Sequence, residues 1–153
     1  MATSSIKIND ARLQDIPQLV HLLKELFYIE KDFKPDTIKQ SIGLELLINS
    51  PIQGVIKVAR NAENNIIGMV SVQLVISTAQ GAASAWVEDM IISKPYRAAG
   101  LGKALLDAAL QWAKEKGATR AQLLVDIENE PAIGYYRHLG WEATQLQARR
   151  MFI

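Results

Sequence analysis

Cysteine is absent from the 153-residue chain, and histidine occurs only twice. Without cysteine there is no disulfide, no thiolate metal site and no cysteine nucleophile. His21 and His138 lie far apart in the sequence and lack the close spacing of a zinc site. The sequence therefore predicts a protein without a metal centre, and it excludes chemistry that passes through an acylated cysteine.

Long apolar runs and compositional bias are also missing. No uncharged apolar stretch approaches the roughly 18 residues that a membrane-spanning helix needs, and residues 1–5 lack the apolar segment of a signal peptide. Nine glycines, five prolines and 49% apolar residues are ordinary for a globular protein. We therefore expect a soluble, cytoplasmic protein and, at this length, a single domain over residues 1–153.

The net charge is small, but it is unevenly distributed along the chain. The whole sequence carries +1, whereas residues 94–120 hold six basic and two acidic side chains and so carry +4. The rest of the chain is therefore acidic. One short basic segment argues against a nucleic-acid-binding protein, which needs a wide positive face.

Hydrophobic periodicity and capping residues predict an alternation of strands and helices. Asp15 is expected to cap the first helix, and Ile38, Ile42, Leu46 and Leu47 are expected to form the buried face of the second. The predicted strands are residues 6–9, 55–58, 66–76, 85–92, 120–125, 141–144 and 149–153, and the predicted helices are residues 16–29, 36–48, 102–116 and 131–139.

Residues 97–103 lie between a predicted strand and a predicted helix. Gly100 and Gly102 allow backbone N–H groups to face one point, the helix N-terminus adds partial positive charge, and Arg97 and Lys103 add full charges. This pattern predicts a site for phosphate. The alternative is a tight turn whose cations are only solvated. The segment matches neither the Rossmann nor the Walker pattern.

Two motifs give the chain a resemblance to a known family. Arg97-x-x-Gly100-x-Gly102 resembles the pyrophosphate loop of the GNAT superfamily of acetyl-CoA-dependent N-acetyltransferases. Residues 129–141 resemble the second motif of that family, Asn-x-x-Ala-x-x-Phe/Tyr-Tyr-x-x-x-Gly-Phe/Trp. The resemblance implies an α/β (α+β) fold, with a mixed, mostly antiparallel central sheet of about seven strands flanked by four helices. One departure is Ala98, where the family usually has glycine and where a positive φ is disfavoured for alanine.

The resemblance also implies how acetyl-CoA binds and is used. The strand before the loop pairs with the pantetheine arm, the loop N–H groups hold the pyrophosphate, and Asn129 contacts the arm near its thioester. Tyr136 is implied as the acid that protonates the departing thiolate, the alternative being a buried aromatic residue of a helix. The cofactor-binding set is Met90, Ile91, Ile92, Arg97, Ala98, Ala99, Gly100, Leu101, Gly102, Lys103, Asn129 and Tyr136.

Two adjacent carboxylates interrupt an apolar predicted strand. Glu88 and Asp89 are costly there unless water or a cation satisfies them. In a regular strand they point to opposite faces, so one of them meets the cleft. We assign Glu88 as the base that deprotonates the attacking ammonium and Asp89 as a contact for a second ammonium. A bulge in the strand would exchange the two, and an exposed edge charge is the alternative.

The predicted function is direct acetyl transfer from acetyl-CoA to a small primary amine in a ternary complex, without metal; a homodimer is a further expectation. The sequence Trp86-Val87-Glu88-Asp89 resembles polyamine and diamine N-acetyltransferases within the family. The residues at the end of the first predicted helix are expected to contact the acceptor. The equal alternative is that they are ordinary residues of the core and of the solvated helix face. The alternatives are a protein N-terminal or lysine acetyltransferase and a non-catalytic acetyl-CoA-binding sensor. The expected acceptor contacts are Phe27, Tyr28, Glu30, Asp32 and Phe33.

Overall fold

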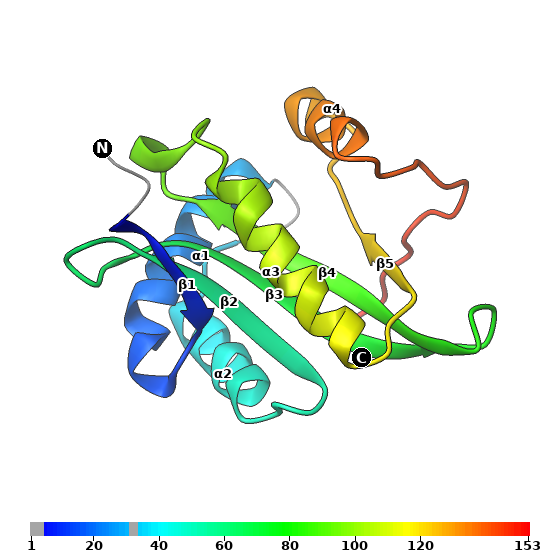
Figure 1. Ribbon diagram of the computed structural model, residues 1–153, viewed down its shortest axis with the longest axis horizontal. Helices are drawn as coiled ribbons and strands as arrows, with labels where there is room; N and C mark the ends of the chain where they lie inside the picture. Colours follow the sequence, from blue (N-terminus) through cyan, green and yellow to red (C-terminus); the bar gives the residue numbers. More distant parts are fainter. Residues whose placement is uncertain (1–4, 31–33) are drawn as a thin grey trace. The chain divides into compact units, whose positions relative to one another are not determined.

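A computed structural model describes residues 5–30 and 34–153 (Figure 1). They belong to two compact units, Met1–Gln122 and Leu123–Ile153, and each unit is described by itself. The elements are β1 (Lys7–Asp10), a 3-10 turn (Leu13–Asp15), α1 (Ile16–Ile29), α2 (Thr37–Ile48), β2 (Gly54–Arg60), β3 (Ile66–Ser77), β4 (Ala82–Ile92), a second 3-10 turn (Lys94–Tyr96), α3 (Leu101–Glu115), β5 (Arg120–Leu123) and α4 (Glu130–His138).

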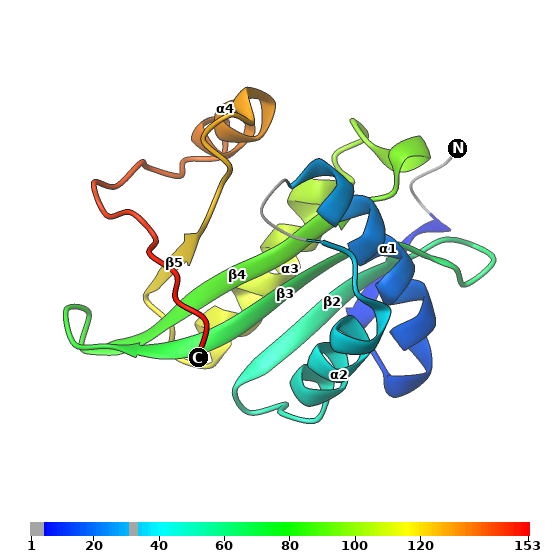
Figure 2. The ribbon, with the colours of Figure 1, turned by 180° about the vertical axis from the view of Figure 1, so that it is seen from behind.

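The sheet has five strands in the order β1-β2-β3-β4-β5, and the first three pairings are antiparallel. α1 and α2 cover one face of strands β1 to β4, and α3 covers the other (Figures 1 and 2). The mixed α/β class is therefore confirmed. Under α1 lies a core of buried side chains: Leu19, Leu22, Leu23, Leu26, Leu44, Ile56, Val58, Ile66, Met69 and Ile91.

The predicted start of α2 and end of α3 hold because their capping residues behave as expected. The Asp36 side chain accepts a hydrogen bond from the Lys39 N–H at 3.1 Å and starts α2. Gly117 follows α3 with φ +94°, a left-handed conformation that glycine adopts without strain. None of the helices within residues 5–30 and 34–153 has the length and apolar character that crossing a bilayer requires.

The residue at the start of α1 is buried in an ion pair. Asp15 occupies the predicted N-cap position, but its side chain makes no capping bond. Its two carboxylate oxygens accept hydrogen bonds from the Arg60 guanidinium of β2 at 2.9 and 2.6 Å, and Arg60 Nε donates to Asn9 Oδ1 at 2.9 Å. The Arg60 guanidinium holds the pKa of Asp15 below its usual range. The cluster thus ties β1, β2 and the start of α1 together.

The predicted buried face of α2 is wrong. Ile38, Ile42 and Leu46 are 74%, 53% and 66% exposed, whereas Gln40 and Leu44 are buried. Two apolar series run along this helix, one through Ile38 and the other through Leu44, and periodicity alone does not say which one faces the core. Of the predicted face, only Leu47 packs against the core.

Two of the predicted strands do not form, so the sheet has five strands instead of about seven. Residues 141–144 and 149–153 carry no strand, and Leu146, Met151 and Phe152 are exposed. A hairpin of two short strands is marginal in water, because it buries little apolar surface. The homodimer stays a prediction.

Candidate active site

Strand β4 is irregular at its two adjacent carboxylates. Between the cross-strand pairs Ser71–Glu88 and Met69–Ile91, β4 contains one residue more than β3. Asp89 lies in this bulge with φ +54°, in the left-handed region that Asp enters more readily than most residues. The bulge therefore changes the direction of the Asp89 side chain relative to a regular strand.

The bulge brings both carboxylates to one face of the sheet. Ser71 is two residues from Met69, which packs in the core under α1, so its side chain lies on that face too. Ser71 Oγ is 3.1 Å from the Glu88 carbonyl oxygen and 3.4 Å from Asp89 Oδ2. Glu88 is directly opposite Ser71 and points the same way. The prediction that the two carboxylates face opposite sides is therefore wrong, because it assumed a regular strand.

The two carboxylates have different surroundings. Glu88 is exposed, and its Oε1 accepts a hydrogen bond from the indole Nε1 of Trp86 at 2.5 Å. Asp89 is half-buried. Burial, and then the charge of Glu88, raise the pKa of Asp89 to about 6, against a smaller lowering by the hydrogen bond from Ser71. Asp89 is therefore a proton acceptor matched to neutral pH.

Asp89→Asn is expected to stabilise the protein at pH 7 by about 3 kcal/mol. The pKa of Asp89 is higher in the folded protein than in the unfolded chain. Its ionisation therefore opposes folding, with no effect below about pH 4 and the full effect above about pH 6. Urea unfolding at both pH values measures the gain. An equal stability of the variant and the wild type at pH 7 would mean that the carboxylate is not desolvated.

The loop of residues 97–103 has the shape of an anion site. Gly100 is the N-cap of α3 with φ +79°, and Ala98 has φ +64°. Left-handed residues of this kind curve the chain into a concave array of N–H groups, and the first N–H groups of α3 have no acceptor within the helix. Arg97 Nε donates to the Ile92 carbonyl oxygen at 2.7 Å, which ties the loop to the end of β4. Lys103 pairs with Asp107 at 2.6 Å.

Ala98→Gly is expected to stabilise the folded protein by about 0.5–1 kcal/mol, because a left-handed alanine costs about 1–2 kcal/mol and glycine recovers part of it against its larger unfolded-state entropy. Ala99→Gly is the matched control, since Ala99 is not among the residues with positive φ. This control should lose stability. Urea unfolding of both variants measures the difference, and equal effects would contradict the strained conformation of Ala98.

The second unit contains the two predicted site residues of the second motif. Asn129 is the N-cap of α4, and its Oδ1 accepts a hydrogen bond from the Ala132 N–H at 3.2 Å. Tyr136 is half-buried, and its ring meets Trp141 edge to face with centroids 5.9 Å apart. The packing of Tyr136 thus depends on its ring, whereas its hydroxyl is the group with the predicted chemical role.

The end of α1, which carries Phe27, Tyr28 and Glu30 of the predicted acceptor contacts, covers the sheet face to which the two carboxylates point (Figure 2). Phe27 packs against the core, Tyr28 is 74% exposed, and Glu30 is the half-buried C-cap residue. Asp32 and Phe33 fall outside the described residues. Ser71 was not anticipated as part of the site, because nothing in the sequence marks a serine within an apolar strand until its register is known.

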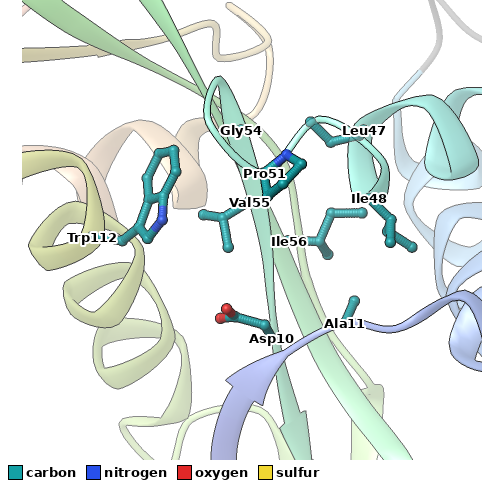
Figure 3. A pocket seen from close by; sticks show the side chains of 9 residues that line it. All are labelled: Asp10, Ala11, Leu47, Ile48, Pro51, Gly54, Val55, Ile56 and Trp112. Carbon is teal, nitrogen blue, oxygen red and sulfur yellow. The ribbon is translucent and has the colours of Figure 1, made fainter. Parts of the chain in front are cut away.

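Two further features contribute nothing to this site. A hollow at the edge of β2 lies between Trp112 of α3 and Leu47 and Ile48 of α2, beside Val55 (Figure 3). The predicted site residues are not among those that line it. Within residues 5–30 and 34–153, no group of three or more His, Asp or Glu side chains is arranged to hold a metal ion.

Comparison with known proteins gives consistent matches. A family model described as "Acetyltransferase (GNAT) family" matches residues 16–141. An uncharacterised N-acetyltransferase of Methanocaldococcus jannaschii is 31% identical over 71 residues, which are 46% of this chain and 31% of that protein. A Bacillus subtilis protein, named provisionally as a ribosomal protein bS18-alanine N-acetyltransferase, is 27% identical over 88% of this chain and 80% of its own.

The fold is also shared with a solved structure. The crystal structure of a possible acetyltransferase from Clostridium difficile 630 has a TM-score of 0.84, covers 97% of both chains and is 17% identical. At that identity the likeness concerns the fold alone. The match to the Methanocaldococcus protein spans less than a third of that relative's length.

Proposed function

The chain belongs to the acetyltransferase (GNAT) family, and we propose that it is an acyl-CoA N-acetyltransferase that moves acetyl from acetyl-CoA to a small primary amine in the cytoplasm. The proposal rests on one observation: strand β4 carries two carboxylates and also adjoins the loop of residues 97–103. β4 bears the carboxylates Glu88 and Asp89, and its last residue, Ile92, is bonded to Arg97 of the anion loop at 2.7 Å. An amine site and a phosphate site therefore adjoin on one rigid element.

The residues of the loop fit the pyrophosphate of acetyl-CoA. Ala98, Ala99 and Gly100 are exposed, and a side chain built on Gly100 would meet no atom within 4 Å. The space in front of the loop N–H groups is thus open to a phosphate, and residues 94–120 supply the positive charge. Backbone groups of Met90, Ile91 and Ile92 and the side chain of Asn129 are proposed to hold the pantetheine arm.

The proposed reaction is direct attack on the bound thioester. A primary ammonium with a pKa of about 10.4 is neutral in only about one molecule in 2,500 at pH 7, so a base must take its proton before the nitrogen attacks. We assign this step to the carboxylates of β4, with Glu88 as the first candidate. The amine then bonds to the acetyl carbon, the C–S bond breaks, and Tyr136 gives its proton to the thiolate. Holding both substrates together supplies much of the rate.

A small acceptor is favoured because two carboxylates share one sheet face, which suits a compact cation with one or two ammonium groups. Acetylation of a protein N-terminus is the second candidate function. It is supported by the name of the Bacillus subtilis relative, which refers to the alanine of a ribosomal protein. In both cases the nucleophile is a primary amine, so the chemistry at β4 is the same.

A thiol-release assay with acetyl-CoA tests the proposal across a panel of polyamines, aminoglycosides, amino acids and N-terminal peptides. We expect at least one small amine to give a kcat/KM at least ten-fold above that of every peptide. The reverse order would favour the protein acetyltransferase. Tight binding of acetyl-CoA in calorimetry without thiol release from any acceptor would indicate a non-catalytic sensor and contradict the proposal.

A further inference from the structure

We propose that Asp89, rather than Glu88, takes the proton from the attacking amine, and that Ser71 is the positioning residue that holds the Asp89 carboxylate for this step. The inference rests on the proposed acetyltransferase function and assigns roles within its site. It follows from the register of β3 and β4 and from the partners of the two carboxylates.

The bulge fixes where the Asp89 carboxylate lies. A regular strand would turn this side chain toward α3, away from Glu88. With φ +54° it instead comes within 3.4 Å of Ser71 Oγ, on the face covered by α1. Ser71 is only 2% exposed, so water does not replace its hydroxyl. The position of the carboxylate therefore depends on one buried hydroxyl group.

Glu88 is engaged elsewhere. Its Oε1 accepts the indole N–H of Trp86 at 2.5 Å, which draws the carboxylate along the strand toward the residue two places before it. Glu88 is exposed, whereas Asp89 is half-buried. Burial favours the protonated form of a carboxylate, so the partly desolvated Asp89 is suited to accept a proton. Glu88 is thus suited to attract the ammonium and to raise the proton affinity of its neighbour.

The hydroxyl of Ser71 has one proton and two acceptors, the Glu88 carbonyl oxygen at 3.1 Å and Asp89 Oδ2 at 3.4 Å. While Asp89 is ionised, the hydroxyl proton is shared with its carboxylate. Once Asp89 takes a proton, the hydroxyl can donate to the Glu88 carbonyl oxygen alone. The Ser71 hydroxyl therefore keeps a hydrogen-bond acceptor in both protonation states of Asp89. Asp89 can gain and lose a proton without a change of the backbone.

The surroundings of Asp89 agree with this role. Burial and the Glu88 charge raise the pKa of Asp89 to about 6. Among residues 5–30 and 34–153, Glu88 is the charged group that raises the pKa of Asp89. Of the elements packed against β4, which are β3, α1 and α3, β3 supplies the group that lowers this pKa, the Ser71 hydroxyl. In the reaction, one ammonium proton moves to Asp89, and the freed nitrogen lone pair attacks the acetyl carbon. The C–S bond then breaks, and coenzyme A leaves as a thiolate that takes its proton from Tyr136. The second proton that the nitrogen loses restores Tyr136, and Asp89 returns its own proton to water.

The test is the pH dependence of kcat/KM from pH 5 to 9 for the wild type and for Asp89→Asn, Glu88→Gln and Ser71→Ala. The wild type should lose activity below about pH 6. Asp89→Asn should lower kcat by about 10²–10⁴-fold and abolish this acid limb. Glu88→Gln should keep the limb and move it to lower pH, because a like charge is removed. Ser71→Ala should move it to higher pH, because the bond that favours the ionised form is lost.

Ser84→Ala is the matched control, because Ser84 is a 1% exposed serine of β4 whose Oγ contacts Arg120 instead. Its acid limb should stay in place. Loss of activity in Asp89→Asn will not reflect unfolding, since this variant is expected to be more stable than the wild type.

Three results would overturn the proposal. Wild-type activity in Asp89→Asn, or disappearance of the acid limb in Glu88→Gln, would remove Asp89 as the base. An unmoved limb in Ser71→Ala would remove the positioning role of the serine, because a purely structural loss lowers activity equally at every pH. A wild type that acetylates no amine would remove the proposed function itself, which is a distinct outcome.

Discussion

Arg60→Met is expected to lower the free energy of unfolding by about 3–5 kcal/mol, because it leaves a buried carboxylate without its partner. The side chains of Arg60 and Asp15 are only 9% and 6% exposed, and two hydrogen bonds join them. Arg60 also holds Asn9 of β1. Methionine fills the space of the arginine stem but carries no charge to pair with the Asp15 carboxylate. Asp15 must then stay charged in an apolar setting or take up a proton.

Lys57→Met provides the comparison for Arg60→Met. Lys57 pairs with Asp10, whose side chain is 61% exposed, and an exposed pair contributes only about 0–1 kcal/mol. Urea unfolding at pH 7 measures both variants. A loss below about 1 kcal/mol for Arg60→Met would contradict burial of the pair.

The contribution of the buried pair should also depend on pH. Because the pKa of Asp15 is lowered in the folded protein, the stabilisation is complete above its ordinary value of about 3.8 and is lost as the pH falls through the lowered pKa. The difference in stability between the wild type and Arg60→Met should therefore shrink below about pH 4.

Tyr136→Phe is expected to lower kcat by roughly 10²-fold, with little change in the affinity for acetyl-CoA. A thiolate is already a tolerable leaving group, since a thiol such as that of cysteine has a pKa of about 8.5, so the effect lies at the low end for general acid catalysis. Phenylalanine keeps the ring that packs against Trp141, and the fold of α4 should persist. Steady-state kinetics and calorimetry with acetyl-CoA separate the two quantities.

Tyr135→Phe is the control for Tyr136→Phe, since the adjacent tyrosine is 37% exposed and its ring also packs edge to face, against Tyr136 at 5.5 Å. It should retain wild-type kcat. An unchanged kcat in Tyr136→Phe would remove this hydroxyl from the mechanism.

The parts of the fold that follow from the sequence are those with a local cause. Residues close in sequence determine four features: the strand β3, the turn between β2 and β3, the start of α2 at Asp36 and the end of α3 at Gly117. The buried face of α2 depends instead on what α2 packs against, and sequence periodicity is compatible with either choice. The last two predicted strands do not form, because a strand needs a pairing partner that the local sequence does not specify.

The same distinction between local and long-range causes applies to the candidate site. The position of the 97–103 loop between a strand and a helix was predictable, because Gly100 and Gly102 mark a turn locally, whereas the left-handed φ of +64° at Ala98 was not. Its role as an anion site stays a prediction. The roles of Glu88 and Asp89 were not predictable, because one extra residue in β4 decides which way Asp89 points. That residue is visible only when the two strands are aligned. Ser71 enters the site for the same reason, through register and not through any motif.

The most direct test of the account is a stoichiometric one. The wild type is incubated with acetyl-CoA and the best small amine of the panel, free thiol is followed by absorbance, and the acetylated amine is quantified by mass spectrometry. We expect one acetylated amine for each thiol released, at a rate that falls below about pH 6. Thiol release without an acetylated amine, or no thiol release with any amine, would contradict it.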